Sequence, residues 1–154
     1  MTTQNITNTQ KPIPFCQIVL SANQSIAAST TTILQFNFAV IDNASSFNTG
    51  SFQFLPILPN LAWYYFSANI VYTNNTGSYT VNSFFSKNST STQGAQSIQG
   101  TFVSGNISSF TCGSLISLNG TTDFVNVKIL SGAAITVLGG STSQSVLNVF
   151  YIPQ

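Results

Sequence analysis

Apolar and polar residues alternate with a period of two along most of the chain. Between residues 62 and 72, Tyr64 and Phe66 fall on one side and Trp63 and Tyr65 on the other. Such alternation predicts β-strands, and no sustained apolar stripe with the 3.6-residue period of a helix occurs. Turn motifs rich in Asn and Gly separate the runs. Strands are predicted at residues 14–20, 31–41, 51–57, 62–73, 78–86, 98–104, 109–118, 123–130, 133–138 and 145–152.

This pattern predicts the fold class and the domain organisation. Many short strands within 154 residues are typical of an all-β antiparallel sandwich or a closed barrel, here with about 8–10 strands. Residues 86–100 are rich in Ser, Thr and Gln, which predicts an exposed loop. Residues 1–11 are expected to form a flexible polar N-terminal arm, and residues 12–154 a single domain.

Several predicted strands carry large apolar side chains on both faces, most clearly at 63–66 and 149–152. A sandwich core uses only one face of each strand. The second face needs a cover, and further copies of the chain in a closed cyclic assembly would supply it. The alternative is that these side chains cap one edge of a single core.

Charge is almost absent, which excludes several classes of function. Only 3% of the residues are charged, and the chain has three Lys, two Asp and no Arg, Glu or His. Nucleic-acid binding needs a basic footprint and is not expected. Acid–base catalysis and metal binding lack their usual side chains, so we predict no catalytic residues, no cofactor and no metal. Asp42 and Asp123 are interpreted as turn residues, and the side chains of Lys11, Lys87 and Lys128 as solvated.

The two cysteines, Cys16 and Cys112, stand in apolar surroundings and are interpreted as small buried apolar residues, with a disulfide bridge as the alternative. The N-terminus has neither a basic start nor an apolar run, so no signal peptide is expected. No apolar stretch approaches the roughly 18 residues of a spanning helix, and membrane insertion is not expected.

A spaced aromatic pattern carries a resemblance to a known family. Phe36, Asp42, Phe47 and Phe54 are followed by Ala62-Trp63-Tyr64-Tyr65-Phe66-Ser67. The stretches 114–127 and 146–154 continue the pattern. Together they resemble the trimeric jelly rolls of the complement globular-head and tumour-necrosis-factor superfamily over residues 12–154. The composition is also similar to the globular tip of collagen-like glycoproteins on bacterial spores.

The resemblance implies a homotrimeric, TNF-like jelly roll. Ala62 stands where the family has Gly, and the calcium-binding acidic residues of some members have no counterpart. In the family, the strands that match 14–20, 62–69, 109–118 and 145–152 lie near the threefold axis. The candidate trimer-interface residues are therefore Trp63, Tyr65, Phe110, Val146 and Phe150. Packing in an ordinary core is the alternative for each of them.

These observations favour a non-enzymatic structural or attachment protein on the exterior of a virus particle, as a minor capsid, fibre, decoration or host-attachment component. Its partners would be further copies of itself and, through the N-terminal arm, other capsid or surface-layer proteins. One alternative is a trimeric tip at a spore or cell surface. Another is a soluble, extracellular receptor- or glycan-binding module of the cytokine or lectin type, with Trp63 or Tyr79 as a stacking platform.

Overall fold

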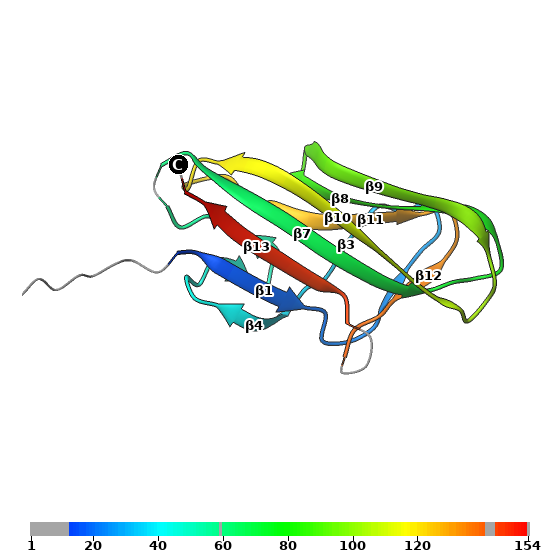
Figure 1. Ribbon diagram of the computed structural model, residues 1–154. Coiled ribbons are helices and arrows are strands. Elements are labelled where there is room, and N and C mark those ends of the chain that lie inside the picture. The colour runs from blue at the N-terminus through cyan, green and yellow to red at the C-terminus, as the bar shows by residue number, and fades with distance from the viewer. Residues whose placement is uncertain (1–12, 59, 141–143, 154) are drawn as a thin grey trace, which may run out of the picture.

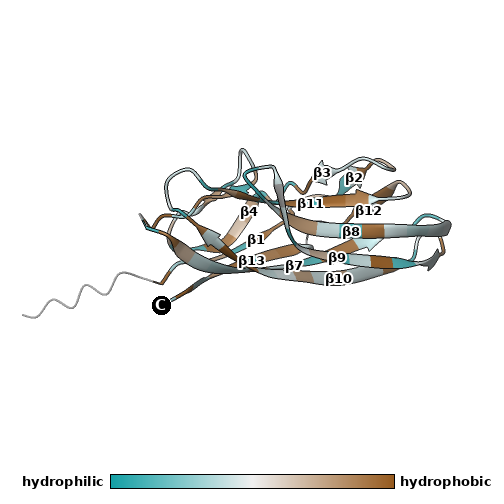
Figure 2. Ribbon diagram, turned by 90° about the horizontal axis from the view of Figure 1, so that it is seen from above, coloured by the Kyte–Doolittle hydropathy of each residue, from teal (hydrophilic) through white to brown (hydrophobic). Residues whose placement is uncertain are grey.

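The protein is built from strands arranged in two layers (Figures 1 and 2). The computed structural model describes residues 13–58, 60–140 and 144–153. These residues contain thirteen strands and no helix, and so no helix there is long and apolar enough to cross a membrane. The predicted arm at 1–11 lies outside the described residues. The two layers are antiparallel sheets that face each other, which makes the fold a sandwich.

The first layer is a seven-stranded sheet, which lies in front in Figure 1. Six of its strands follow the order β2-β12-β7-β13-β1-β4, and β10 pairs along the other edge of β7. Its members are β1 (Phe15–Val19), β2 (Gln24–Ile26), β4 (Phe38–Asp42), β7 (Ala62–Thr73), β10 (Ile107–Leu118), β12 (Ile135–Val137) and β13 (Val146–Ile152).

The second layer is a six-stranded sheet behind the first. Five of its strands follow the order β5-β6-β11-β8-β9, and β3 also pairs with β11. Its members are β3 (Thr32–Ile33), β5 (Phe47–Asn48), β6 (Gln53–Phe54), β8 (Gly77–Lys87), β9 (Ser91–Phe102) and β11 (Val125–Ser131).

The core lies between the sheets and follows the period-two pattern. On β7, every second residue from Ala62 to Tyr72 is buried, and the residues between them face outward. The rings of Phe54 and Phe66 from opposite layers meet edge to face at 5.3 Å, and Phe66 lies 5.5 Å from Phe85. The predictions of an all-β fold and of a strand at 62–73 are confirmed.

The prediction of a single strand at residues 31–41 is wrong. The segment divides into β3, which pairs with β11 in one sheet, and β4, which pairs with β1 in the other. Leu34 and Phe36 are buried where the chain crosses between the layers, whereas Phe38 is 57% exposed. Continuous alternation hid the crossing, because a strand that changes sheets keeps its extended backbone.

The prediction of an exposed loop at residues 86–100 is also wrong, because β9 extends from Ser91 to Phe102. Its polar residues pair with β8 along most of its length. A turn from Lys87 to Thr90 reverses the chain, and its central residues Asn88 and Ser89 both have positive φ, 51° and 63°, as in the tight turns that join paired strands. The strand is specified by this turn and by the edge of β8, since its own sequence has little apolar alternation.

Shorter elements differ in detail. The strand predicted at 51–57 is reduced to β6, and the two-residue β5 and three-residue β2 were not predicted. Strands this short depend on neighbouring backbone more than on their own sequence.

Candidate functional site: the outward face of the seven-stranded sheet

The outward face of the seven-stranded sheet carries a cluster of apolar side chains at one end. The register places Leu115, Tyr65 and Phe150 side by side on β10, β7 and β13. Their exposed fractions are 51%, 42% and 41%. Phe15 continues the row on β1, with its ring 4.8 Å from that of Phe150. With the adjacent Trp63 and Ile152, these form the apolar end, defined as Phe15, Trp63, Tyr65, Leu115, Phe150 and Ile152.

A glycine shapes this surface. A methyl group at Gly113 would lie 2.6 Å from Tyr65 Oη, so the Tyr65 side chain lies over the bare backbone of Gly113. The absence of a side chain at Gly113 lets the tyrosine lie along the sheet instead of standing away from it. The apolar end is therefore flattened where β7 meets β10.

Polar residues follow on the same face, one row further along the strands. Gln17 and Asn148 are directly paired on β1 and β13, and Gln17 Nε2 donates to Asn148 Oδ1 at 2.9 Å. In the next row, Thr111 Oγ1 donates to Asn69 Oδ1 at 3.3 Å. The face therefore divides into an apolar end and a neutral amide and hydroxyl region.

Four of the five candidate interface residues share this face. Trp63, Tyr65, Val146 and Phe150 are partly or largely exposed on its outward side. Phe110 does not join them: it is 7% exposed, pairs with Ile70 and points into the core. Its ring lies 5.9 Å from that of Tyr72.

Sequence reasoning missed three members of the apolar end, namely Phe15, Leu115 and Ile152. For Leu115 a signal was available: Cys112, Ile116 and Leu118 mark the even-numbered positions of β10 as core, so an apolar residue at an odd-numbered position faces outward. Phe110 also stands at an even-numbered position, so the same signal favours the alternative of core packing for it.

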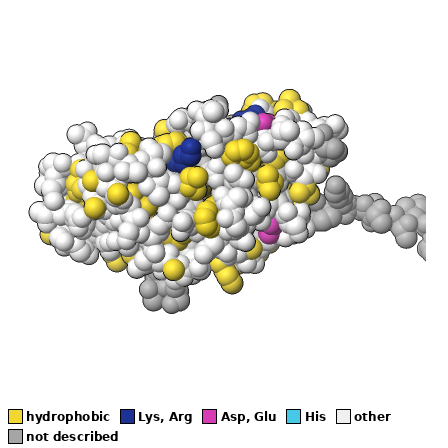
Figure 3. Space-filling model, turned by 180° about the vertical axis from the view of Figure 1, so that it is seen from behind, with side chains coloured by type: hydrophobic (Ala, Val, Ile, Leu, Met, Phe, Trp, Pro, Cys, Tyr) yellow, Lys and Arg dark blue, Asp and Glu magenta, His cyan; other side chains and the backbone are white. Residues whose placement is uncertain are grey.

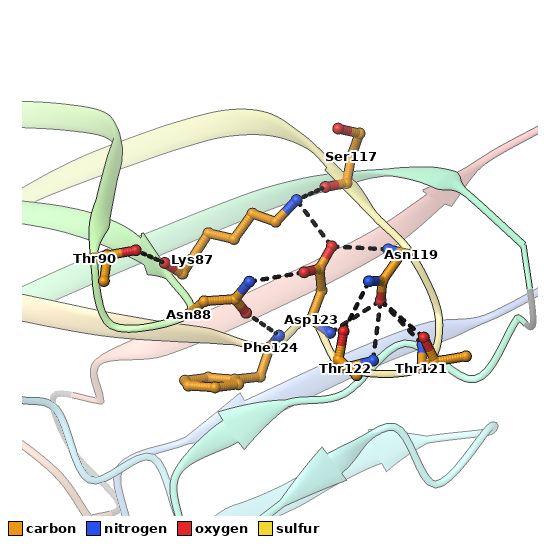
Figure 4. Close-up of polar contacts among 9 residues, drawn as sticks. All are labelled: Lys87, Asn88, Thr90, Ser117, Asn119, Thr121, Thr122, Asp123 and Phe124. Carbon is orange, nitrogen blue, oxygen red and sulfur yellow. Dashed lines mark hydrogen bonds and ion pairs between the residues drawn. The ribbon is translucent and has the colours of Figure 1, made fainter.

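A polar cluster ties two turns together close to this face (Figure 4). Lys87 Nζ lies 2.9 Å from Asp123 Oδ2 and donates to the Ser117 carbonyl oxygen at 2.7 Å. Asn88 Nδ2 donates to Asp123 Oδ1 at 2.7 Å, and the Asn119 N–H donates to Asp123 Oδ2 at 2.9 Å. The β8–β9 turn is thereby joined to the β10–β11 turn.

This cluster corrects the interpretation of Lys87 as a solvated residue. The Lys87 side chain is only 25% exposed and that of Asp123 9%. Burial by itself would raise the pKa of Asp123. The hydrogen bonds from Asn88, Lys87 and the Asn119 backbone, with the positive charge of Lys87, outweigh burial and hold that pKa below its usual range. The sequence did not reveal the pair because 36 positions separate its members.

Asp42 behaves as the sequence predicts for a turn residue. Its two carboxylate oxygens each accept one backbone N–H at 2.9 Å, from Ser46 and Phe47. These contacts stabilise the turn after β4. Within the described ranges, no group of three His, Cys, Asp or Glu residues is placed to hold a metal ion.

The cysteines are free and buried, as expected for small apolar residues. Cys16 on β1 and Cys112 on β10 are separated by β13 and β7, or about 14 Å at the usual strand spacing. A disulfide needs Cα atoms within about 7 Å, so the two thiols cannot form a bridge in this fold. Burial raises the pKa of both thiols, and the negative charge of Asp42 raises that of Cys16 further.

A groove of about 390 Å³ lies beside the apolar end, between its outermost side chains and β9. Trp63, Leu115 and Gln93 line it, together with Lys87, Ile116 and Ser117. It offers an indole ring, an aliphatic wall and an amide. The far side of the molecule, viewed from behind in Figure 3, is mostly uncharged polar surface with scattered apolar side chains.

Comparisons with known proteins identify the architecture. No protein-family model matches the sequence, and a search of curated proteins gives no match. Among solved structures, the globular domain of zebrafish complement 1qA protein matches with a TM-score of 0.59 and 17% identity, covering 93% of this chain and 99% of that one. The structure of Eiger TNF from S. frugiperda matches with a TM-score of 0.65 and 11% identity, covering 94% and 95%.

The fold is therefore the jelly roll of these two structures, a complement globular domain and a tumour necrosis factor. The resemblance found in the spaced aromatics is thus confirmed at the level of the fold, as is the predicted TNF-like sandwich. In this jelly roll, Phe36 and Phe54 of the aromatic pattern are core residues, and Asp42 stabilises a turn.

Proposed function

We propose that this protein is a non-enzymatic structural or attachment module that assembles as a homotrimer through the outward face of the seven-stranded sheet. The observation that carries the proposal is the apolar end. Tyr65, Leu115 and Phe150 stand next to one another with about half of each side chain in water. A contiguous exposed patch of this kind is typical of an interaction site.

The free energy of apolar burial favours covering the apolar end with another apolar surface. Complete burial of a large apolar side chain contributes about 1.5–3 kcal/mol, so covering one that is already half buried contributes about 1 kcal/mol. Six such side chains in each chain together offset the cost of association, which is at least about 4 kcal/mol. Cyclic assembly places the apolar end of every copy against a neighbouring copy. The resemblance to trimeric jelly rolls supports three as the number of copies.

The chemistry of the remaining surface supports a place on the exterior of a particle. Three Lys and two Asp leave little to titrate and little to be screened by salt. A seam held by apolar contacts with a hydroxyl and amide exterior therefore tolerates changes of pH and ionic strength. We favour the surface of a virus particle, with a spore or cell surface as the alternative setting.

The test is the mass of the protein in solution. Light scattering at micromolar concentration should give three times the 16.4 kDa chain mass. Phe150→Asp should reduce this to the mass of one chain, because it places a charge in the seam. Phe84→Asp is the matched control, since Phe84 faces outward on the six-stranded sheet, and it should remain trimeric. A wild-type protein with the mass of one chain would contradict the proposal.

The groove beside Trp63 favours a second candidate, a soluble glycan-binding module. Indole rings stack on sugar faces, and Gln93 and Lys87 supply polar groups at the same groove. The two candidates differ at Trp63, the only tryptophan of the chain. Acrylamide should quench its fluorescence weakly if a neighbouring copy covers the face. Strong quenching that a sugar ligand reduces would favour glycan binding.

A further inference from the structure

The paired amides Gln17 and Asn148 lie in the middle of the face that the proposed assembly covers. The register aligns them directly across β1 and β13. On one side lies the Phe15–Phe150 pair, and on the other the Val19–Val146 pair. Both amides are partly exposed. A neutral polar pair is thus enclosed along its strands by apolar pairs.

The hydrogen bond between the two side chains uses only part of their capacity. Gln17 Nε2 donates to Asn148 Oδ1 at 2.9 Å. Among the described residues, Gln17 Oε1 and Asn148 Nδ2 make no further hydrogen bond, so water satisfies them on the exposed face. Each side-chain amide offers two donors and two acceptor positions. The pair therefore carries unused donors and acceptors toward whatever covers it.

We infer that the Gln17–Asn148 pair fixes the register of the assembly by requiring a polar partner across the seam. This inference rests on the proposed homotrimer. In the correct arrangement, neighbouring copies place polar groups or trapped water against each pair. In a shifted arrangement, an apolar row of the neighbour covers the pair. Leaving a buried donor or acceptor unsatisfied costs about 1–3 kcal/mol.

Contacts at the apolar end cannot select one register of the assembly over another. Contacts among Phe, Tyr, Leu and Ile side chains are non-directional, so shifted seams would bury nearly the same area. A single polar position within an apolar seam is a known way to fix register and the number of copies, at some cost in stability. On β1 and β13 the amide pair likewise lies between two apolar pairs, whereas Asn69 and Thr111 continue the outer row on β7 and β10.

The test compares the wild type with the double variant Gln17→Leu/Asn148→Leu by native mass spectrometry and light scattering over a range of concentrations. The wild type should be a single trimeric species. The variant should still associate, but as a mixture, with the non-trimeric fraction raised about tenfold or more, as expected when a penalty of this size is removed. Asn82→Leu on the outward side of β8 is the matched control and should remain a single trimer.

The outcomes separate this inference from the proposed function. A monomeric wild type would contradict both. A trimeric wild type with a double variant that forms the same single trimer would contradict the register role alone. Gln17→Met, which changes volume less, provides a second variant if the double variant is poorly folded. Retention of a single trimer by folded Gln17→Met at every concentration would likewise count against the inference.

Discussion

At the scale of single residues, Gly94 lets β9 and β10 approach closely, and Gly113 leaves room on β10 for a side chain of β7. Gly94 on β9 has a φ of 54°, and a methyl group there would lie 2.5 Å from both the Gly113 carbonyl oxygen and Ser114 Cβ. Gly113 on β10 in turn leaves room for the Tyr65 ring. The two layers therefore meet at this edge through backbone contact, while the bare backbone of Gly113 flattens the candidate assembly surface under Tyr65.

Gly94→Ala should destabilise the fold, because its Cβ overlaps backbone and its φ is unfavourable for an L-residue. We expect a loss of about 1–3 kcal/mol and a fall in Tm of about 3–10 °C, measured by thermal unfolding. Gly100→Ala is the matched control on the same strand, since its nearest contacts are Phe102 ring atoms at 3.6–3.9 Å. Equal losses in the two variants would contradict the close approach.

At the scale of elements, the turns depend on a few charged and amide side chains. The β8–β9 and β10–β11 turns share the cluster around Asp123, whereas Asp42 and the side chain of Asn43 hold the turn after β4. Both carboxylates accept backbone N–H groups, but among the residues that the structure describes only Asp123 also pairs with a cation. The Asp123 cluster therefore joins a turn within the six-stranded sheet to a connection between the two sheets.

Asp123→Asn should cost more stability than Asp42→Asn. Both substitutions remove a charge that accepts backbone N–H groups, but only the first leaves the Lys87 ammonium, on a side chain that is 25% exposed, without its counter-ion. We expect a loss of about 1–2 kcal/mol for Asp123→Asn, because the partial exposure of Lys87 weakens the pair. Urea denaturation measures both variants, and an equal or larger loss for Asp42→Asn would show that the cation contributes nothing.

At the scale of the whole molecule, the scarcity of titratable groups determines the response to pH. The chain has no histidine, and its two carboxylates are both engaged in the fold. The pKa of Asp123 is lowered, so its contribution to stability is complete above the ordinary Asp pKa of about 3.9 and is lost as pH falls from there through the lowered value. The pKa values of Cys16 and Cys112 are raised, so their contribution is complete at neutral pH and declines as pH rises above about 8.5.

The Tm should therefore be nearly constant between about pH 5 and pH 8, and should fall below about pH 4 and above about pH 8.5. Differential scanning fluorimetry across this range measures the profile. Asp123→Asn should reduce the fall on the acid side, because the variant has no carboxylate to protonate at that position. A marked change in Tm between pH 6 and pH 7 would contradict this account.

The sequence by itself determined the strand character of the chain and which residues of the strand at 62–73 share a face. Alternation is a local property, so the two faces of β7 could be separated without knowledge of any partner strand, and the structure decided that the face of Tyr64 and Phe66 is the core. The turn role of Asp42 was equally local, because its contacts lie within five residues. The spaced aromatics further indicated the jelly roll, since several of them are core residues whose separation follows the lengths of the strands.

Only the tertiary structure decided the features that depend on register between distant segments. The polar strand β9 exists because β8 offers it an edge. Lys87 meets Asp123, and Gln17 meets Asn148, across 36 and 131 positions of sequence. Such contacts depend on the pairing of all the strands together, which no local pattern of apolar and polar residues specifies.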